Sequence, residues 1–146
     1  MFRNILIVCM GNICRSPLGK VLFEQAFPNK HIESAGIATK NSGLVGSSAE
    51  STMIETASKC HLDLTRHSAQ QLTEELCRNA DLILVMEQKH IDAVASIAPA
   101  ARGKIMLYGH WLQKEIPDPY KQTKDTFEFV YNLMEEATES WKSKLQ

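Results

Sequence analysis

One short segment near the N-terminus combines residue types that can hold a phosphate group and attack it. Five residues separate Cys9 from Arg15, and Ser16 and Pro17 follow directly. A cysteine thiolate is a strong nucleophile, and the arginine side chain offers a planar fork of N–H donors that matches two phosphate oxygens. The spacing therefore predicts a phosphate-binding loop in which Cys9 is the nucleophile and Arg15 holds the phosphate.

The five residues between Cys9 and Arg15 are expected to contact the phosphate through their backbone. A loop of this length can curl until successive N–H groups point at one anion, and a following helix adds the partial positive charge of its N-terminus. Gly11 and Asn12 tolerate the positive φ that such a curl needs. The predicted contacts are Met10, Gly11, Asn12, Ile13 and Cys14. Ser16 is expected to donate a hydrogen bond to the Cys9 sulfur.

The same residues also fit a structural role, in which Cys9 is a buried cysteine at a strand end and Arg15 is a surface residue of a helix. Placement favours the functional role. Residues 5–9 are wholly apolar and rich in β-branched side chains, which predicts a buried strand, and Ser16-Pro17 suits the capped start of a helix. Parallel sheets bind their ligands in loops of this kind.

Strands and helices alternate along the chain. Short apolar runs predict strands at residues 5–9, 31–35, 81–86 and 104–107. Apolar residues at intervals of three and four predict helices at residues 16–27, 48–61, 88–97 and 123–144. This alternation is typical of parallel βαβ units and of an α/β fold. Residues 38–48, rich in Gly and Ser, are expected to form a long mobile loop.

A second group for the chemistry is expected from Asp118, which stands between Pro117 and Pro119. The two prolines favour an extended backbone that projects the carboxyl group. An acid here can protonate the departing oxygen of a phosphate ester and then activate water. An aspartate in a proline-rich turn is also common, so the prediction depends on its place after the last strand, on the sheet edge of Cys9. Tyr120 can form an aromatic wall of the site or pack elsewhere.

Composition excludes several classes of protein. The chain has 146 residues, 44% of them hydrophobic, which suits one domain spanning residues 1–146. A formal net charge of -1 argues against a nucleic-acid binder that neutralises phosphates over a basic face. No apolar run is long enough to span a bilayer and no signal peptide is recognisable, so we expect a cytoplasmic protein without stable membrane insertion. The spacing of Cys and His predicts no metal site.

Cys60 and Cys77, three of the histidines and both tryptophans are expected to have no chemical role. Four cysteines in a chain without an export signal are expected to stay reduced. Cys60 and Cys77 lie in helical patterns without activating partners and are predicted to be structural. Packing is predicted for Trp111 and Trp141, and core or surface positions are predicted for His67, His90 and His110.

Together these motifs resemble the low-molecular-weight protein tyrosine phosphatases over almost the whole chain. The similarity rests on Cys9 to Pro17, on Ser34-Ala35-Gly36, on residues 81–86 and on Asp118-Pro119-Tyr120. It implies a three-layer α/β sandwich with a four-stranded parallel sheet, and hydrolysis of phosphotyrosine through a cysteinyl-phosphate without a cofactor or metal. By position it implies Cys9 as nucleophile, Arg15 as phosphate clamp and Asp118 as general acid and base. It also implies that Ile37 and Tyr120 border the pocket.

Residues 81–90 and Gly109-His110-Trp111 are most similar to the bacterial members encoded with capsule or exopolysaccharide machinery. This similarity implies that the partner is a phosphotyrosine protein, a cognate tyrosine autokinase of polymer export. We expect the protein to be a monomer that binds no nucleic acid. The family resemblance also supports a reversible Cys9–Cys14 disulfide that protects the nucleophile. The geometry of a curled loop permits this disulfide, and it equally permits Cys14 as a small buried filler.

Three positions depart from the usual family pattern. Gly19 and Lys20 stand where Ala and Glu are usual, and Gln70 stands where a basic residue is common. A glycine inside a helix costs about 1 kcal/mol relative to alanine. None of the three is a chemical residue, so we expect them to change substrate preference rather than activity.

Two other functions share parts of this pattern. Thioredoxin-coupled arsenate reductases have the same fold and loop, but they need two further cysteines close together, whereas Cys60 and Cys77 are seventeen residues apart. A non-catalytic phosphotyrosine-binding module is expected to lack the nucleophile or the acid, and here both Cys9 and Asp118 are present. The sequence therefore favours the phosphatase.

Overall fold

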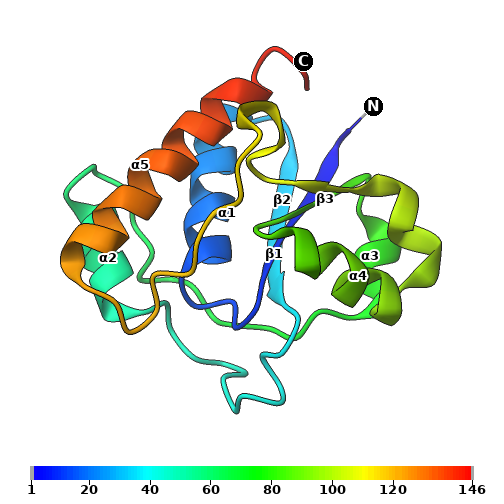
Figure 1. Cartoon of the computed structure of the whole chain (residues 1–146), viewed down its shortest axis with the longest axis horizontal. Helices are drawn as coiled ribbons and strands as arrows, with labels where there is room; N and C mark the ends of the chain where they lie inside the picture. The colour runs from blue at the N-terminus through cyan, green and yellow to red at the C-terminus, as the bar shows by residue number, and fades with distance from the viewer. Residues whose placement is uncertain (1, 146) are drawn as a thin grey trace.

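The computed structural model describes residues 2–145, which form one four-stranded sheet with helices on both faces (Figure 1). The strands are β1 (Asn4–Cys9), β2 (His31–Gly36), β3 (Leu82–Val85) and β4 (Ile105–Leu107). Their order across the sheet is β2-β1-β3-β4, and each neighbouring pair is parallel. The predicted strands and the three-layer α/β sandwich are confirmed.

The helices divide between the two faces of the sheet. The first face carries α1 (Arg15–Ala26), α2 (Ser51–Ser58) and α5 (Lys124–Trp141). The second face carries α3 (Glu74–Asn79), α4 (Gln88–Ile97) and the 3-10 helix η1 (Pro99–Lys104). A short 3-10 turn, η2 (His110–Leu112), follows β4. No helix within residues 2–145 is both long and apolar enough to cross a membrane.

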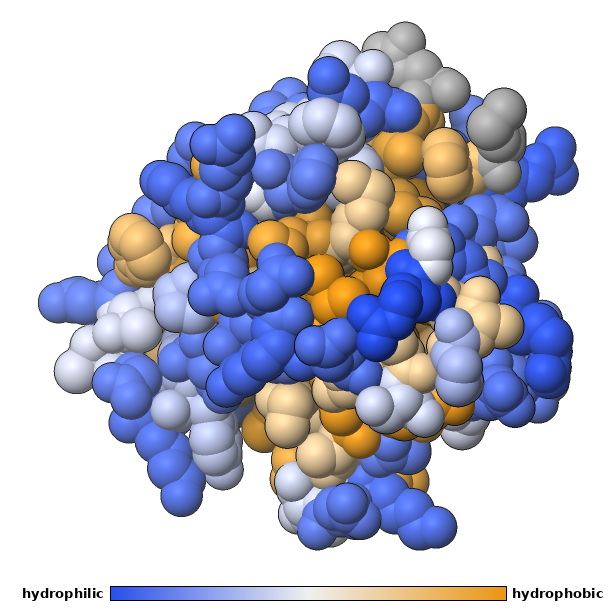
Figure 2. All heavy atoms as spheres, turned by 45° about the vertical axis from the view of Figure 1, so that its right-hand side comes forward, coloured by the Kyte–Doolittle hydropathy of each residue, from blue (hydrophilic) through white to orange (hydrophobic). Residues whose placement is uncertain are grey.

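The strand β1 shows why helices cover both faces. Its side chains alternate in direction, as they do along any strand. Ile5 and Ile7 belong to the core on the side of α1 and α5, whereas Leu6 and Val8 belong to the core on the side of α3 and α4. A strand that is apolar at every position is therefore fully buried only when helices cover both faces of its sheet. On the outer surface seen in Figure 2, apolar side chains gather near the middle of the face and hydrophilic ones surround them.

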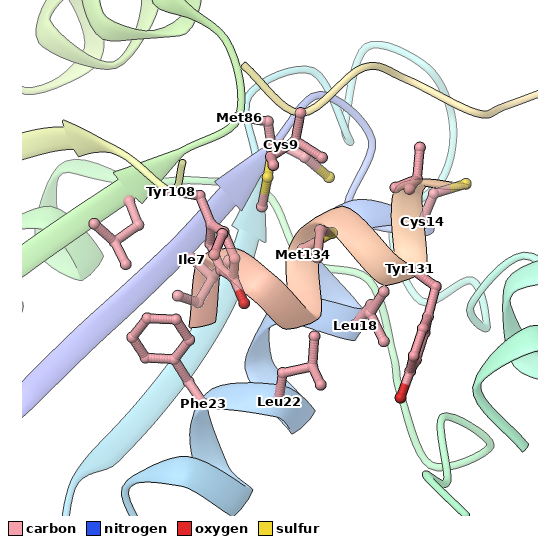
Figure 3. Close-up of a cluster of buried hydrophobic side chains, with 14 of the residues drawn as sticks. Ile7, Cys9, Cys14, Leu18, Leu22, Phe23, Met86, Tyr108, Tyr131 and Met134 are labelled. Carbon is pink, nitrogen blue, oxygen red and sulfur yellow. The ribbon is translucent and has the colours of Figure 1, made fainter. Parts of the chain in front are cut away.

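Gly19 lies on the face of α1 that packs against β1 and α5. A Cβ atom at this position would stand 2.8 Å from Cγ2 of Ile7, 3.0 Å from Cε2 of Tyr108 and 3.3 Å from Cε of Met134. Figure 3 shows these three side chains in the cluster between α1, α5 and the sheet. The glycine that weakens the helix in isolation therefore allows α1 to approach β1, and this approach positions the loop between them.

Several helix ends differ from the prediction. α1 begins at Arg15, so Ser16 is not its cap; the hydroxyl of Ser16 is instead hydrogen-bonded within the loop. The helix predicted at residues 48–61 is shorter, because Glu50 caps α2 at its start and His61, with a φ of 66°, lies beyond its end. The elements α3, η1 and η2 escape prediction because three to six residues are too few to show an apolar period.

The carboxyl edge of the sheet collects three segments. β1 ends at Cys9, and residues 10–14 lead from it into α1. Residues 38–48 have neither helix nor strand, as predicted, and are tied by bonds such as that from Gly46 N–H to Ala69 O at 2.8 Å. Ile116 N–H donates to Met86 O at 2.8 Å, which brings residues 116–120 to the end of β3. The predicted chemical residues therefore lie on one edge.

Candidate active site

The loop after β1 turns its carbonyl groups outward. All five carbonyl oxygens of residues 9–13 accept a hydrogen bond from a neighbouring segment, at 2.5 to 2.9 Å. The donors are the N–H groups of Ile37, Ala38 and Glu50, the hydroxyl of Thr39 and the ring of His67. Since the C=O and N–H of a trans peptide point in opposite directions, the N–H groups of residues 10–14 face the inside of the curl. This backbone is suited to hold an anion.

Asn12 keeps the curl in shape from a buried position. Its φ is 61°, the left-handed value that the turn needs. Its side-chain NH2 donates to Ser16 Oγ at 2.7 Å and to Ser34 Oγ at 3.0 Å. Its Oδ1 accepts the N–H of Gln70 at 2.9 Å. Asn12 and Ser16 are fully buried and do not line the pocket, so they support the loop rather than contact a ligand.

Cys9 lies at the base of the curl with its sulfur beside a hydroxyl group. Cys9 Sγ is 2.9 Å from Ser16 Oγ, and the residue is buried. Because Ser16 Oγ already accepts a hydrogen bond from Asn12, the hydroxyl proton is free to point at the sulfur. That hydrogen bond and the inward N–H groups together stabilise negative charge on the sulfur.

The Arg15 side chain is buried and held by protein oxygens. Its Nη1 donates to Glu87 Oε2 at 2.6 Å and to Ile116 O at 2.7 Å. These bonds occupy one nitrogen of the guanidinium group and leave the N–H groups of the other two for a phosphate. Only 2% of the side chain is exposed, so its position is set before any ligand arrives.

Glu87 connects the loop to α4, and although it lies within residues 81–90 the sequence predicts no role for it. Burial acts to raise the pKa of its carboxyl group, but the hydrogen bond and charge of Arg15 outweigh burial and leave this pKa below its usual value. Glu87 N–H donates to Nδ1 of the buried His90, whose Nε2 has no hydrogen-bond partner within residues 2–145. Burial, and then the charge of Arg15, lower the pKa of His90. The one sequence signal for Glu87 is its place shortly after β3.

Asp118 lies at the mouth of the pocket on an exposed segment. Its Oδ2 is 3.8 Å from Arg15 Nη2, and 49% of its side chain is exposed. Its Oδ1 accepts the N–H of Tyr120 at 3.0 Å, which is a local turn of the kind aspartate favours. The carboxyl group thus shares the pocket of Cys9 and is open to solvent.

A pocket of about 230 Å³ joins these groups. It is lined by Cys9, Met10, Gly11, Ile13, Cys14, Arg15, Ser42, Leu44, Asp118 and Tyr120. Tyr120 therefore borders the site and does not pack in the core. Ile37 does not line the pocket, because its side chain packs against the core on the α4 side of the sheet. Ser42 and Leu44 contribute to the wall instead, and the sequence signals their segment only through its Gly- and Ser-rich composition.

The remaining cysteines and tryptophans differ in their surroundings. Cys14 is buried beside the pocket, and burial is the main reason that its pKa is raised. Cys77, in α3, is buried in the core, as predicted. Cys60 does not lie in a helix as predicted, because α2 ends before it, and it is exposed rather than packed. Trp141 packs in the core, whereas Trp111 is 41% exposed and packs only in part, with its ring against those of Trp141 and His110.

Within residues 2–145, no group of three or more His, Cys, Asp or Glu side chains is arranged to hold a metal ion. The polar groups of the site instead face the pocket from the loop after β1, from Arg15 and from Asp118. This arrangement is typical of enzymes in which a thiol attacks a phosphate ester held by backbone amides.

Comparisons with known proteins agree with this class of site. The family model of the low molecular weight phosphotyrosine protein phosphatases matches residues 4–146. The chain is 50% identical over 146 residues to the probable low molecular weight protein-tyrosine-phosphatase AmsI of Erwinia amylovora, with 99% of each chain covered. It is 47% identical to the low molecular weight protein-tyrosine-phosphatase Wzb of Escherichia coli K12, with 99% of this chain and 97% of that protein covered.

A solved structure extends this similarity to the fold. The structure of Vibrio vulnificus Wzb in complex with benzylphosphonate matches with a TM-score of 0.97 at 49% identity, covering 99% of this chain and 100% of that one. The chain therefore belongs to the low molecular weight phosphotyrosine protein phosphatase family, and it is a protein-tyrosine-phosphatase. The family predicted from the sequence motifs is confirmed.

Proposed function

We propose that Cys9, Arg15 and Asp118 hydrolyse phosphotyrosine in two steps. The Cys9 thiolate attacks phosphorus, the bond to the tyrosyl oxygen breaks, and the Asp118 carboxyl gives its proton to that oxygen. Asp118, now a carboxylate, takes a proton from water as the water oxygen attacks the cysteinyl-phosphate. This step releases inorganic phosphate and restores the Cys9 thiolate. Arg15 and the N–H groups of residues 10–14 hold the phosphate oxygens throughout.

One observation carries this proposal: the three residues come from separate parts of the chain and line one small pocket. Substrate contacts are proposed for the other lining residues that the sequence motifs single out, namely Met10, Gly11, Ile13, Cys14 and Tyr120. The Vibrio vulnificus relative binds benzylphosphonate, which carries an aromatic ring and a phosphonate group as phosphotyrosine carries a ring and a phosphate. Tyr120 and Leu44, with Met10 and Ile13, offer apolar surface to such a ring.

The placement of the cysteines supports the phosphatase over a thiol-relay reductase. Cys60 is exposed after α2, on the first face of the sheet, whereas Cys77 is buried in α3 on the second face (Figure 1). Neither lines the pocket of Cys9. A relay of disulfides needs thiols that can reach one another, and these thiols lie on opposite sides of the sheet.

Hydrolysis of a phosphotyrosine peptide by the purified protein tests the proposal. We expect turnover of the peptide and of p-nitrophenyl phosphate, inhibition by vanadate, and no turnover by Cys9→Ser. Substantial activity in Cys9→Ser would overturn the proposed steps. Binding of the peptide without turnover by the wild type would indicate a non-catalytic module, and thioredoxin-dependent reduction of arsenate would indicate the reductase.

We further propose that the substrate is a cognate tyrosine autokinase of capsule or exopolysaccharide export, and that the protein acts as a monomeric single domain in the cytoplasm. Residues 81–90, Gly109-His110-Trp111 and the similarity to AmsI and Wzb support this assignment. A thiolate nucleophile also works best in a reducing compartment. Co-expression with the autokinase should remove its phosphotyrosine with the wild type but not with Cys9→Ser. Equal phosphotyrosine in both cases would contradict the assignment.

A further inference from the structure

A second hollow adjoins the pocket of Cys9 and continues it along the Asp118 segment. Its volume is about 600 Å³, which is ordinary for a ligand site. Met10, Arg15 and Asp118 line both hollows. The other residues that line it are Glu87, Lys89, Lys114, Glu115, Pro117, Phe129 and Leu133. A polypeptide whose phosphotyrosine enters the pocket has a direct path into this hollow, which we name the flank groove.

The apolar part of the flank groove is open to solvent. Phe129 is 59% exposed and Met10 is 38% exposed. Phe129 lies on α5 but outside its buried stripe, and neither side chain belongs to a hydrophobic core within residues 2–145. Covering large apolar side chains with a ligand removes apolar area from water and so favours binding. This part of the groove fits an apolar side chain of a bound polypeptide.

The charged part of the flank groove contains the carboxylates of Glu87, Glu115 and Asp118 and the ammonium groups of Lys89 and Lys114. Glu87 is bonded to Arg15, and Glu115 Oε2 accepts a backbone N–H at the start of α4 at 2.6 Å. The Lys89 side chain is 73% exposed and its Nζ is 3.6 Å from Glu87 Oε1. Lys114 is exposed and has no ion pair within residues 2–145. Lys114 is therefore open to pair with an acidic side chain of a ligand, and the exposed Lys89 lies in the same groove.

We propose that the flank groove binds the polypeptide next to the phosphotyrosine and selects a stretch that contains an apolar and an acidic side chain. The inference rests on phosphotyrosine hydrolysis at Cys9. Phe129 covers the apolar side chain, and Lys89 and Lys114 pair with the acidic one. Selection among protein substrates then depends on a surface that a small aryl phosphate does not reach.

Two phosphotyrosine peptides that differ only in the flank test this proposal. One carries Leu and Glu beside the phosphotyrosine, the other carries Ser and Lys, and p-nitrophenyl phosphate reports on the pocket alone. We expect the wild type to favour the first peptide about tenfold in kcat/KM, or ~1.4 kcal/mol. Phe129→Ser should reduce this preference through KM, and Lys89→Glu combined with Lys114→Glu should reverse it. Lys142→Glu, a change of an exposed lysine after α5, should keep the wild-type preference.

The outcomes separate the groove from the proposed chemistry. Equal kcat/KM for the two peptides in the wild type, or an unchanged preference in the variants, would overturn the flank groove and leave phosphotyrosine hydrolysis intact. If the wild type turns over none of the three substrates, hydrolysis at Cys9 is refuted instead. Sedimentation tests a different occupant. A dimer formed by the wild type and lost in Phe129→Ser would show that a second copy of the chain covers the groove, and would also overturn the proposal.

Discussion

The loop of residues 9–15 and the segment of residues 116–120 meet at one pocket but are built in opposite ways. In the loop, every carbonyl of residues 9–13 is hydrogen-bonded to a neighbouring segment, and Arg15 is buried between Glu87 and Ile116. In the segment, the Asp118 side chain is 49% exposed and its carboxyl group accepts one backbone N–H. The first region is fixed before a substrate binds, whereas the second is open.

This difference fits the two tasks that we propose for the regions. A phosphate presents the same oxygens in every substrate, so groups that are fixed in advance stabilise it without reorganisation. The rest of the substrate varies, and an exposed acid beside an open groove can meet different leaving groups and flanks. The regions are joined at Ile116, whose carbonyl accepts a hydrogen bond from Arg15 and whose N–H donates to Met86.

The largest effect is expected from a change inside the fixed region. Arg15→Lys keeps the positive charge but loses the planar fork that can hold both the protein oxygens and a phosphate. Removal of a preorganised donor costs about two to three orders of magnitude in kcat, so we expect a loss of about a thousandfold with p-nitrophenyl phosphate. Steady-state kinetics measures it. Arg102→Lys, at an exposed arginine that pairs with Asp92, is the matched control and should keep wild-type kinetics. If kcat falls less than tenfold in Arg15→Lys, the fixed geometry of Arg15 is not what stabilises the phosphate.

A change in the open region should depend on the substrate. Asp118→Asn cannot protonate a leaving group, and general acid–base catalysis contributes about a hundredfold or more. We expect at least that loss for a phosphotyrosine peptide, and a smaller one for p-nitrophenyl phosphate because p-nitrophenolate leaves without a proton. Equal losses for both substrates would show that Asp118 supports the fold of the pocket rather than proton transfer.

The contact between Glu87 and Arg15 tests how strictly the fixed region must be held. Glu87→Gln keeps a hydrogen-bond acceptor but removes the charge, and charge-assisted bonds are about twice as strong as neutral ones. We expect kcat/KM to fall about tenfold, phosphate to inhibit less strongly, and Glu87→Asp to restore part of the loss. Glu33→Gln, at an exposed glutamate of β2, is the control. If Glu87 only caps α4, the thermal midpoint will fall while phosphate inhibition stays unchanged.

The two regions also differ in how far the sequence reveals them. Arg15 and Asp118 can be predicted because their signals are local, namely a five-residue spacing and two flanking prolines. Glu87 and His67 reach Arg15 and Asn12 across 72 and 55 positions of the chain, and nothing beside them in the sequence marks that contact. Contacts made by the tertiary fold thus escape a local pattern, even where they hold a predicted site.

The same limit applies to the fold. Strands and long helices are predictable from their apolar periods, whereas α3, with six residues, has no complete second turn. Ser16 has the properties of a helix cap, but it lies inside α1, and its hydroxyl group is hydrogen-bonded to Cys9 and Asn12 instead. At Gly19 the sequence shows only that glycine lowers helix propensity. The side chains that leave no room for a Cβ atom there belong to residues far away in the sequence.

Gly19→Ala measures the packing that supports the fixed region. Alanine improves helix propensity by about 1 kcal/mol, but overpacking a close contact costs about 1–3 kcal/mol. With Ile7 Cγ2 at 2.8 Å from the new Cβ, we expect overpacking to dominate and the free energy of unfolding to fall by about 1 kcal/mol. Urea unfolding measures it. Gly103→Ala is the control, because a Cβ there meets no atom within 4 Å. A more stable Gly19→Ala would show that α1 can shift without cost.

The smallest effect is expected from pH, through the buried His90 and the half-buried His67 behind the fixed region. Burial lowers the pKa of His67 and of His90 below the ordinary value of 6.5, in His67 despite its hydrogen bond to Asn12. Unfolding exposes both rings, so below pH 6.5 the unfolded chain binds protons that the folded chain does not bind. The contribution to stability is therefore complete above pH 6.5 and is lost as the pH falls through 6.5 toward the folded pKa values.

Urea unfolding between about pH 7.5 and 5.5 measures this decrease in the free energy of unfolding. His67→Gln and His90→Gln each remove one titrating ring and should reduce the dependence, whereas His31→Gln controls for the loss of an exposed histidine. Glu87 does not interfere, because its pKa lies below the ordinary 4.5 and so outside this range. A constant free energy of unfolding in the wild type would contradict the prediction. If the decrease in the free energy of unfolding becomes smaller in His67→Gln and His90→Gln, the loss of stability in acid arises next to the fixed region and not in the Asp118 segment.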